Sequence, residues 1–549
     1  MTCCPSVPAI EEPMQAGGIS SRHACLLLCA LCAAAAVDSM NSTVLVIARA
    51  QVMGSVHATP DEIAWVHMGY VAAKLTAFPV AAWMAMRMSA AVLIAAATLG
   101  LLVSALGCFW AHGLLELVVW RIVQGIAGAL ILVVGQAVLF SVFARARQGL
   151  VQAVFAFATI MVPTTLAPAL QGWVVDQFEW QWMFLASLPL GVVGGSAVFL
   201  APRRYRSTIT NGPFDWLGLI LFGSGMTTMV FLTQEGSRHN WFDEVEIVQC
   251  AVLALIAFTS FGLWQCLPVN RRRLVDWKVF RDQHFSFGFA VSFVAGCALF
   301  GSAFVIPAFA MGVLDFSPTY AGVLLLPSGL FVCIGLLAAG AIIQFKNLDP
   351  SKPIPLGIAC FMAAMWLLSG STSQSGLADL VPSLLLRGFG LGLLFVSLTL
   401  VTLRDLPDRS LADGIALFNF GRQFGGQIGV AWLSTYLDRQ NALNLTVLAP
   451  NLAPGNGALA ERQEQLAAVL AARGYGMEED TVALTSIIQK AVVQQVATLS
   501  FNECFLAVAL LFVAAAPVLI ATKLLLARTM PHEASSQQVE VSLPPATAE

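Results

Sequence analysis

Charged side chains are scarce in this sequence. Asp, Glu, Lys and Arg make up 11% of its 549 residues, against 58% for hydrophobic residues, whereas a soluble domain carries about 25% charged residues. The formal net charge of −3 offers no basic surface for nucleic acid. We therefore expect neither a soluble multidomain protein nor a partner of nucleic acid.

Motifs that carry enzyme chemistry are also missing. The sequence holds no HExxH zinc motif, no GxSxG nucleophile elbow and no P-loop. Cys25, Cys29 and Cys32 share one predicted helical face, but no His or carboxylate joins them at the spacing of metal ligands. We expect no enzyme, no metal, no cofactor and no disulfide framework. The missing P-loop also argues against ATP hydrolysis as an energy source.

Apolar blocks of about 20 residues, the length that crosses about 30 Å of hydrocarbon, recur along the whole chain. The first begins near Ala24 and is too long to belong to a cleaved signal peptide. The sequence therefore predicts an all-α integral membrane protein with fourteen transmembrane helices. The predicted spans are 24–48, 63–84, 89–110, 115–140, 148–172, 182–201, 214–234, 246–267, 285–311, 320–341, 354–370, 379–403, 410–434 and 500–527.

The distribution of Lys and Arg predicts the orientation. An even number of spans puts both termini on one side, and the loops and tails of that side hold most of the 28 Lys and Arg residues. The opposite short loops hold only Arg49 and Arg238. Because short cytoplasmic loops are the basic ones, we expect a multi-pass protein of the plasma (inner) membrane, with cytoplasmic N- and C-termini and a long outer loop over 435–499.

Four basic residues outside the loops, Lys74, Arg121, Arg387 and Arg422, fall inside predicted spans, and Asp38 joins them as the central acid. Such a charge costs about 2.5–3.5 kcal/mol on insertion scales, so it usually faces a cavity or a partner. Asp38 and Lys74 lie near the predicted midplane of two sequential antiparallel helices. They suit a proton-coupling acid–base pair, because desolvation and opposite charge both act on their protonation. Two alternatives stay open: a static ion pair that fixes the two helices, and attraction of an anionic substrate by Lys74.

A short internal repeat suggests how the helices are grouped. Trp120–Gly128 and Leu386–Gly392 each put an Arg just inside the outer end of a span, followed by closely spaced glycines, and eight helices separate them. This offset predicts two six-helix halves with two extra helices between them, an arrangement typical of alternating access. The glycines alone would also suit close helix packing. The predicted division is 1–201 for the first half, 202–284 for the extra pair, 285–527 for the second half and 528–549 for a cytoplasmic tail.

Motifs along nearly the whole chain resemble those of one known family. In order they are Asp38–Val44, Trp65 with Val66 and Tyr70, Arg121 with Gln124 and Gly125, Ala167–Asp176, Trp180–Phe184, Pro189 with Gly191, Phe214–Leu219, and Asn419, Arg422 and Gln423 with Gly425, Gly426 and Gly429. On these motifs the chain resembles the EmrB/QacA-type fourteen-span drug:proton antiporters of the major facilitator superfamily, especially the EmrB-like branch. It departs from them over 81–90, where AAWMAMRMSA has Arg87 alone in place of a glycine, an aspartate and an arginine-rich run.

This resemblance implies proton-coupled efflux (antiport) of amphipathic small molecules or drugs, driven by the proton gradient without a cofactor. It assigns Asp38 and Arg121 to proton coupling, to which we add Lys74, and it identifies Pro168 and Gly172 as the antiporter motif. The implied substrate cavity consists of Asn41, Gln124, Asn419, Arg422 and Gln423. Helix-end anchoring by Arg121 and a packing role for Arg422 with Asn419 remain alternatives. So does a major-facilitator uptake symporter or uniporter for a small organic solute.

The outer segment is far longer than ordinary connections, and it contains Pro450, Pro454 and two amphipathic stretches, Ala458–Arg473 and Thr481–Val496. These stretches predict short surface helices, whose apolar faces must pack on the protein's own outer surface or on a second chain. The resemblance implies a periplasmic membrane-fusion adaptor and an outer-membrane channel as partners.

Overall fold

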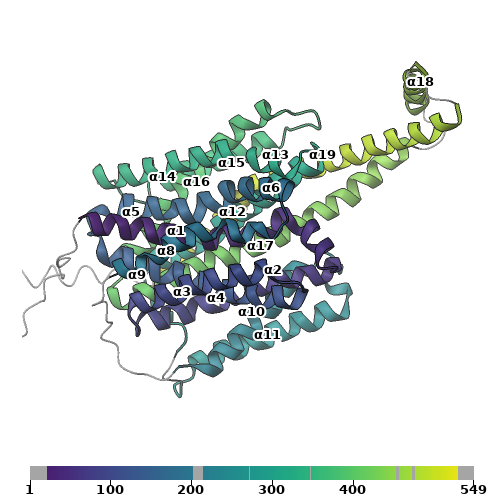
Figure 1. The fold of residues 1–549 in the computed structure, drawn as a ribbon. Helices are drawn as coiled ribbons and strands as arrows, with labels where there is room; N and C mark the ends of the chain where they lie inside the picture. Colours follow the sequence, from purple (N-terminus) through teal and green to yellow (C-terminus); the bar gives the residue numbers. More distant parts are fainter. Residues whose placement is uncertain are drawn as a thin grey trace, which may run out of the picture.

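The computed structural model of the chain is a bundle of long helices that run roughly side by side (Figure 1). It describes residues 21–201, 214–270, 273–346, 348–452, 457–472 and 477–529, and these residues form helices and no strands. The predicted cytoplasmic tail beyond residue 529 lies outside the described residues. Large apolar side chains cover the outside of the bundle: Leu115, Phe199 and Leu263 are 77%, 88% and 70% exposed. A surface of this kind suits lipid rather than water.

Eleven helical segments among the described residues are long and apolar enough to cross a membrane. They coincide with all the predicted spans except the second, the eleventh and the thirteenth. Those three ranges are also helical, as α2 (Pro60–Ala85), α15 (Pro353–Leu368) and α17 (Asp408–Leu448). α15 is only 16 residues long, whereas α2 and α17 carry more polar and charged side chains. The all-helical membrane fold is confirmed, and the number fourteen stays a prediction.

The N-terminal helices are α1 (Ser21–Ser55), α2, α3 (Ala90–Phe109), α4 (Leu114–Val142), η1 (Arg145–Arg147), α5 (Gln148–Ala156), η2 (Phe157–Leu166), α6 (Ala167–Gln177), α7 (Trp182–Ala186), α8 (Leu188–Gly195) and α9 (Ala197–Leu200). A capping box begins α2, because the Thr59 hydroxyl accepts from the Glu62 N–H and the Glu62 carboxylate accepts from the Thr59 N–H. These bonds to Thr59 hold the pKa of Glu62 below its ordinary value. The predicted fifth span is one continuous segment through α5, η2 and α6, and η2 is a π-helix around Pro163.

Two helices follow the N-terminal group, α10 (Trp216–Glu235) and α11 (Val245–Cys266), with η3 (Trp241–Asp243) between them. Asp215 caps α10 by accepting from the Gly218 N–H at 2.8 Å. The same carboxylate accepts from Gln265 Nε2 at 2.8 Å and from Trp264 Nε1 at 2.9 Å on α11. This buried aspartate therefore ties the two helices together at one end of the pair.

The C-terminal helices are η4 (Trp277–Arg281), α12 (Gln283–Gly312), α13 (Pro318–Val323), α14 (Leu326–Phe345), α15, α16 (Leu377–Leu403), α17, η5 (Ala449–Leu452), α18 (Gly457–Ala472) and α19 (Met477–Thr529). Their packing repeats that of the N-terminal group. α4 packs closely against α2 and α3, and α16 packs closely against α14 and α15. The arginines of the sequence repeat, Arg121 and Arg387, occupy corresponding helices and are fully buried. The predicted domain boundaries stay a prediction.

The segment 435–499 is not the loop with short helices that the sequence predicts. Its first part continues α17, which is 41 residues long, and its last part begins α19, which is 53 residues long. The two helices leave the bundle together as a hairpin, and α18 lies near its tip (Figure 1). Packing of α17 on α19, with Asn444 Nδ2 donating to Ser500 Oγ at 3.1 Å, keeps both helices regular beyond their predicted ends. Of the predicted short helices, 458–472 falls within α18, whereas 481–496 is part of α19.

Candidate coupling site and cavity

A buried hydrogen-bonded group joins α1 to α2. Lys74 Nζ lies 2.7 Å from Asp38 Oδ2, and the two side chains are 4% and 1% exposed. The Tyr70 hydroxyl donates to Asp38 Oδ1 at 2.8 Å and accepts from Lys74 Nζ at 2.9 Å. Tyr70 and Lys74 are one turn apart on α2, so both face α1. The two charges that the sequence places near the midplane are thus in direct contact, and a tyrosine bridges them.

A glycine on α4 makes room for this group. A Cβ atom on Gly128 would overlap the Asp38 carboxylate. Any larger residue here would displace Asp38 from Tyr70 and Lys74. The two motif residues of α4 thus have different roles. Arg121 supplies a buried charge, and Gly128 lets α1 approach α4 closely.

Arg121 lies beside the Asp38 group without touching its carboxylate. Its Nη1 donates to the Asn41 carbonyl oxygen at 2.7 Å and to Gln124 Oε1 at 3.0 Å, and its guanidinium lies 4.4 Å from the centre of the Tyr70 ring. Within the described part of the chain it forms no ion pair. Arg121 Nε and Nη2, both side-chain polar atoms of Asn41, and Gln124 Nε2 are buried without a protein partner. Buried polar groups of this kind are ordinarily satisfied by water or a ligand.

The predicted residues of the second half lie at the interface between the halves. Arg422 Nη2 donates to Asn419 Oδ1 at 2.7 Å. Asn419 Nδ2 donates in turn to Gln136 Oε1 of α4 at 3.0 Å, so it crosses from α17 to the N-terminal half. Among the described residues, hydroxyls alone bind the Arg387 side chain, with Ser302 Oγ 3.0 Å from its Nη2 and Ser328 Oγ 3.3 Å from its Nη1.

A cavity of about 250 Å³ opens beside Asp38, Tyr70 and Lys74, the candidate coupling group. Most of the exposed area of its wall is apolar, as is usual for small-molecule sites, although half of its lining side chains carry a polar group. Its principal lining residues are Ser42, Thr43, Arg49, His67, Tyr70, Lys74, Pro163, Thr164, Pro168, Gln234, Glu235, Phe300, Phe304, Gln423 and Gln427. Because Tyr70 and Lys74 line the cavity, Asp38 is one hydrogen bond away from it.

The predicted cavity residues are only partly on this wall. Gln423 lines it, whereas Asn41 and Gln124 lie in the Arg121 group, and Asn419 and Arg422 lie in the interface between α4 and α17. The assignment of all five residues to the substrate cavity stays a prediction. Helix position alone does not say which way a side chain points. Asn419 donates to Gln136 of a neighbouring helix, whereas Gln124 and Arg422 have their partners on their own helices.

The antiporter-motif residues lie on α6. Pro168 lines the cavity, and Gly172 faces the carbonyl of Pro318 at the start of α13, where a Cβ atom would collide with it. Nearby, Asp176 accepts hydrogen bonds from the backbone N–H and the hydroxyl of Thr319. The motif thus packs the end of α6 onto the second half and forms part of the cavity wall.

The sequence analysis did not identify four residues of this region as site residues. Tyr70 stood out only as a motif position, although its place four residues before Lys74 on one helix was a usable signal. His67 precedes it on α2 by about one turn. Gln234 and Glu235 end α10, and an acidic residue at the end of an apolar span was the available sign of Glu235.

Two halves of similarly packed helices, a buried charged group and a cavity between helices of both halves define a membrane transporter of the major facilitator class. The family model described as Major Facilitator Superfamily matches residues 28–430, and the chain belongs to this superfamily. The solved structure of the proton:xylose symporter XylE covers 90% of this chain and 96% of its own with a TM-score of 0.54, at 11% identity. That likeness shows the fold alone.

Within the superfamily the chain is similar to proteins named EmrB. It is 26% identical over 459 residues to the colistin resistance protein EmrB of Acinetobacter baumannii, covering 82% of this chain and 87% of that protein. It is 27% identical over 449 residues to the multidrug export protein EmrB of Haemophilus influenzae, covering 81% and 85%. The resemblance to EmrB-like permeases is confirmed.

Proposed function

We propose that this protein is a proton-coupled exporter of amphipathic small molecules that works by alternating access across the inner membrane. The observation that carries this proposal is the buried contact of Asp38 with Lys74 and Tyr70, at the wall of a mostly apolar cavity. The names of the relatives, multidrug export and colistin resistance, support export. In this proposal α2, α15 and α17 cross the membrane with the eleven apolar segments, which makes fourteen spans, and both termini are cytoplasmic.

The coupling group links proton binding to the cavity. When Asp38 takes up a proton, Lys74 loses its counter-charge while its ammonium remains at the cavity wall. A buried unpaired charge is costly, so protonation favours a rearrangement of α1 against α2 that gives Lys74 a new partner. Arg121 keeps its charge throughout and acts on the same carboxylate across the Tyr70 ring. Proton binding at Asp38 and substrate binding in the cavity thus act on the same hydrogen-bonded group, so each opposes the other.

Inside-out vesicles with an imposed proton gradient test this function. An acidic lumen is expected to drive an amphipathic dye into vesicles that contain the protein, but not into control vesicles without it. For an uncharged dye, a difference of about one pH unit sustains at most about tenfold accumulation per exchanged proton. An uptake symporter would give the opposite direction, with the same gradient driving dye out of the lumen. Loss of dye from preloaded vesicles would therefore favour that alternative.

We further propose that the hairpin of α17 and α19 docks a periplasmic adaptor of the membrane-fusion type, which leads on to an outer-membrane channel. α18 packs on α19 near the tip of the hairpin, away from the helical body (Figure 1). Lys490 of α19 is tied to the body, with its Nζ 3.1 Å from Asp315 Oδ2. The turns beyond it are thus placed to meet a second chain.

Replacing residues 453–488 with a short glycine–serine linker tests adaptor docking. The cut keeps the contact of Lys490 with Asp315 and the bond between Asn444 and Ser500, so the helical body should stay intact. We expect the trimmed protein to bind substrate as before and to lose co-purification with the adaptor, because the projecting surface is gone. Undiminished co-purification of a well-folded trimmed protein would contradict this role.

A further inference from the structure

The end of α10 is attached to both halves of the transporter. Arg238 Nη1, just beyond α10, lies 2.6 Å from Asp61 Oδ1 at the start of α2. On the other side, Gln234 Nε2 donates to Gln427 Oε1 of α17 at 2.8 Å. α10 packs along α2 over a longer stretch and also contacts α17. The extra helices α10 and α11, called the added helix pair below, are therefore packed into the bundle, because α10 closes its side between α2 and α17.

This attachment brings a carboxylate to the cavity. Gln234 and Glu235 line it, and Glu235 is its only acidic lining residue in the described part of the chain. The Glu235 side chain is 4% exposed. Of the basic lining residues, Lys74 already contacts Asp38, and Arg49 Nη2 donates to the carbonyl of Pro60. Among the described lining residues, Glu235 thus carries the one negative charge that a ligand in the cavity meets directly.

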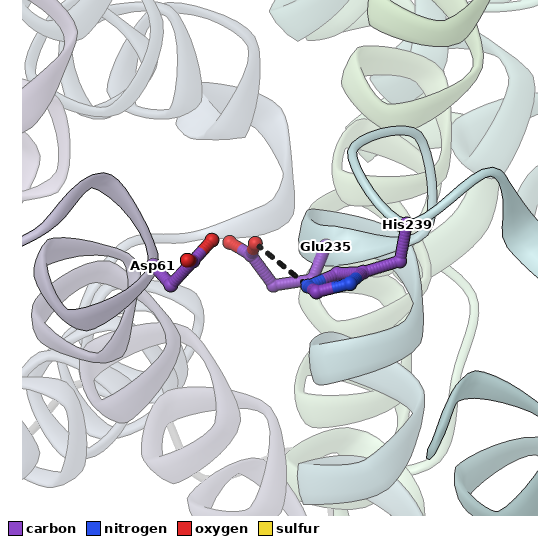
Figure 2. A group of neighbouring side chains, drawn as sticks. All are labelled: Asp61, Glu235 and His239. Carbon is purple, nitrogen blue, oxygen red and sulfur yellow. Dashed lines mark ion pairs between the residues drawn. The ribbon is translucent and has the colours of Figure 1, made fainter. Parts of the chain in front are cut away.

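The partners of Glu235 are on its outer side. Arg238 Nη1 lies 3.1 Å from Glu235 Oε2, so one guanidinium atom contacts both this carboxylate and that of Asp61. Figure 2 shows Asp61 and His239 converging on Glu235, with His239 Nε2 at 4.0 Å. Ligand atoms of these three residues lie within 4.8 Å of one another, but both carboxylates already contact the guanidinium of Arg238.

Arg238 is a weakly held counter-ion. Its side chain is 35% exposed, and ion pairs with solvent access contribute little because water screens them. Glu235, in contrast, is buried at the cavity wall, where a charge acts strongly on a nearby ligand because the dielectric is low. A cation that enters the cavity can therefore replace Arg238 as partner of Glu235, while Arg238 keeps Asp61 and water.

We infer that Glu235, supplied by the added helix pair, is the residue that selects the charge of molecules in the cavity and favours those with a cationic group. This inference rests on the proposed export function and assigns a role to the pair that distinguishes this chain from a twelve-helix transporter. It also gives Arg238 a role, since this residue tunes the selection by holding Glu235 when no cation is bound.

Binding of two hydrophobic ions of one shape tests the inference. Tetraphenylphosphonium is a cation and tetraphenylborate an anion of nearly the same size. Their dissociation constants are measured by equilibrium dialysis with the purified full-length protein in detergent. Glu235→Gln is expected to lower the preference for the cation over the anion about tenfold, equal to about 1.4 kcal/mol. Arg238→Gln is expected to raise the same preference, because it frees the carboxylates of Glu235 and Asp61.

The opposite signs separate charge selection from a structural role. If Glu235 and Arg238 merely held α10 against α2, both variants would change binding in the same direction. The matched control is Glu246→Gln, an exposed carboxylate near the start of α11 that does not line the cavity, and its ratio should equal that of the wild type. An unchanged ratio in Glu235→Gln, or shifts of one sign in both variants, would overturn the inference. Absence of vesicle transport by the wild type would instead contradict the proposed function, since the binding ratio does not depend on transport.

Discussion

Asp38→Asn is expected to abolish gradient-driven export. The amide that replaces the carboxylate can still accept hydrogen bonds from Tyr70 or Lys74, but it cannot exchange a proton, so residue 38 can no longer alternate between a charged and a neutral state. We expect the transport rate under an imposed proton gradient to fall at least about 100-fold, the lower end of what a positioned proton-transfer group contributes. Rates are measured in the inside-out vesicles described above, at equal amounts of inserted protein.

Two measurements keep this test independent of folding. The variant should elute as a single species from size-exclusion chromatography in detergent and should still bind substrate. Asp243→Asn is the matched control, because it makes the same chemical change at an exposed position in η3, between α10 and α11. Normal active transport by the Asp38 variant would mean that the proton is carried elsewhere, and the proposed coupling group would be wrong.

Lys74 and Asp38 are expected to show strong energetic coupling. Each side chain neutralises the other in the membrane interior at a distance of 2.7 Å. Removing one partner of a buried pair leaves an unpaired charge, which costs about 3–5 kcal/mol. We therefore expect Lys74→Met and Asp38→Asn each to lower the free energy of unfolding by an amount of this order. The double variant should lose less than the sum, with an interaction energy of about 0.5–3 kcal/mol.

The same cycle on an exposed pair of the same residue types is the control. Lys490 and Asp315 lie 3.1 Å apart with side chains that are 73% and 65% exposed, so their coupling should be about 0.2–1 kcal/mol. Unfolding is followed by denaturant titration in one detergent for all variants. An interaction energy near zero for Lys74 and Asp38 would show that the two charges do not stabilise each other. It would exclude both the static ion pair and the proton-coupling pair.

The position of the spans could be predicted from the sequence because hydrophobic length is a local property. A stretch of about 20 apolar residues must be satisfied by lipid or by other helices wherever it lies, and eleven predicted spans coincide with segments of that kind. The charged residues Asp38, Lys74 and Arg121 could be singled out for the same reason, since the cost of a charge in hydrocarbon does not depend on the fold. The family motifs then indicated that the protein belongs to the major facilitator superfamily.

The ends of α17 and α19 could not be predicted in this way. Pro450 and Pro454 mark a turn, but the polar residues on either side gave no sign that the helices continue beyond the span. Their regularity comes from packing of one on the other, as the bond between Asn444 and Ser500 illustrates. Partners of this kind are far apart in sequence, so no local pattern reports them.

By itself the sequence determined that this is an all-helical membrane protein of the major facilitator type and which residues are charged within its spans. The tertiary structure alone decided which side chains meet. It put Tyr70 between Asp38 and Lys74, turned Asn419 toward Gln136, and brought Glu235 from the added pair to the cavity. The physical reason is that the rotation of each helix about its own axis is set by the sum of its packing contacts with several neighbours, whereas hydrophobicity and charge are fixed residue by residue.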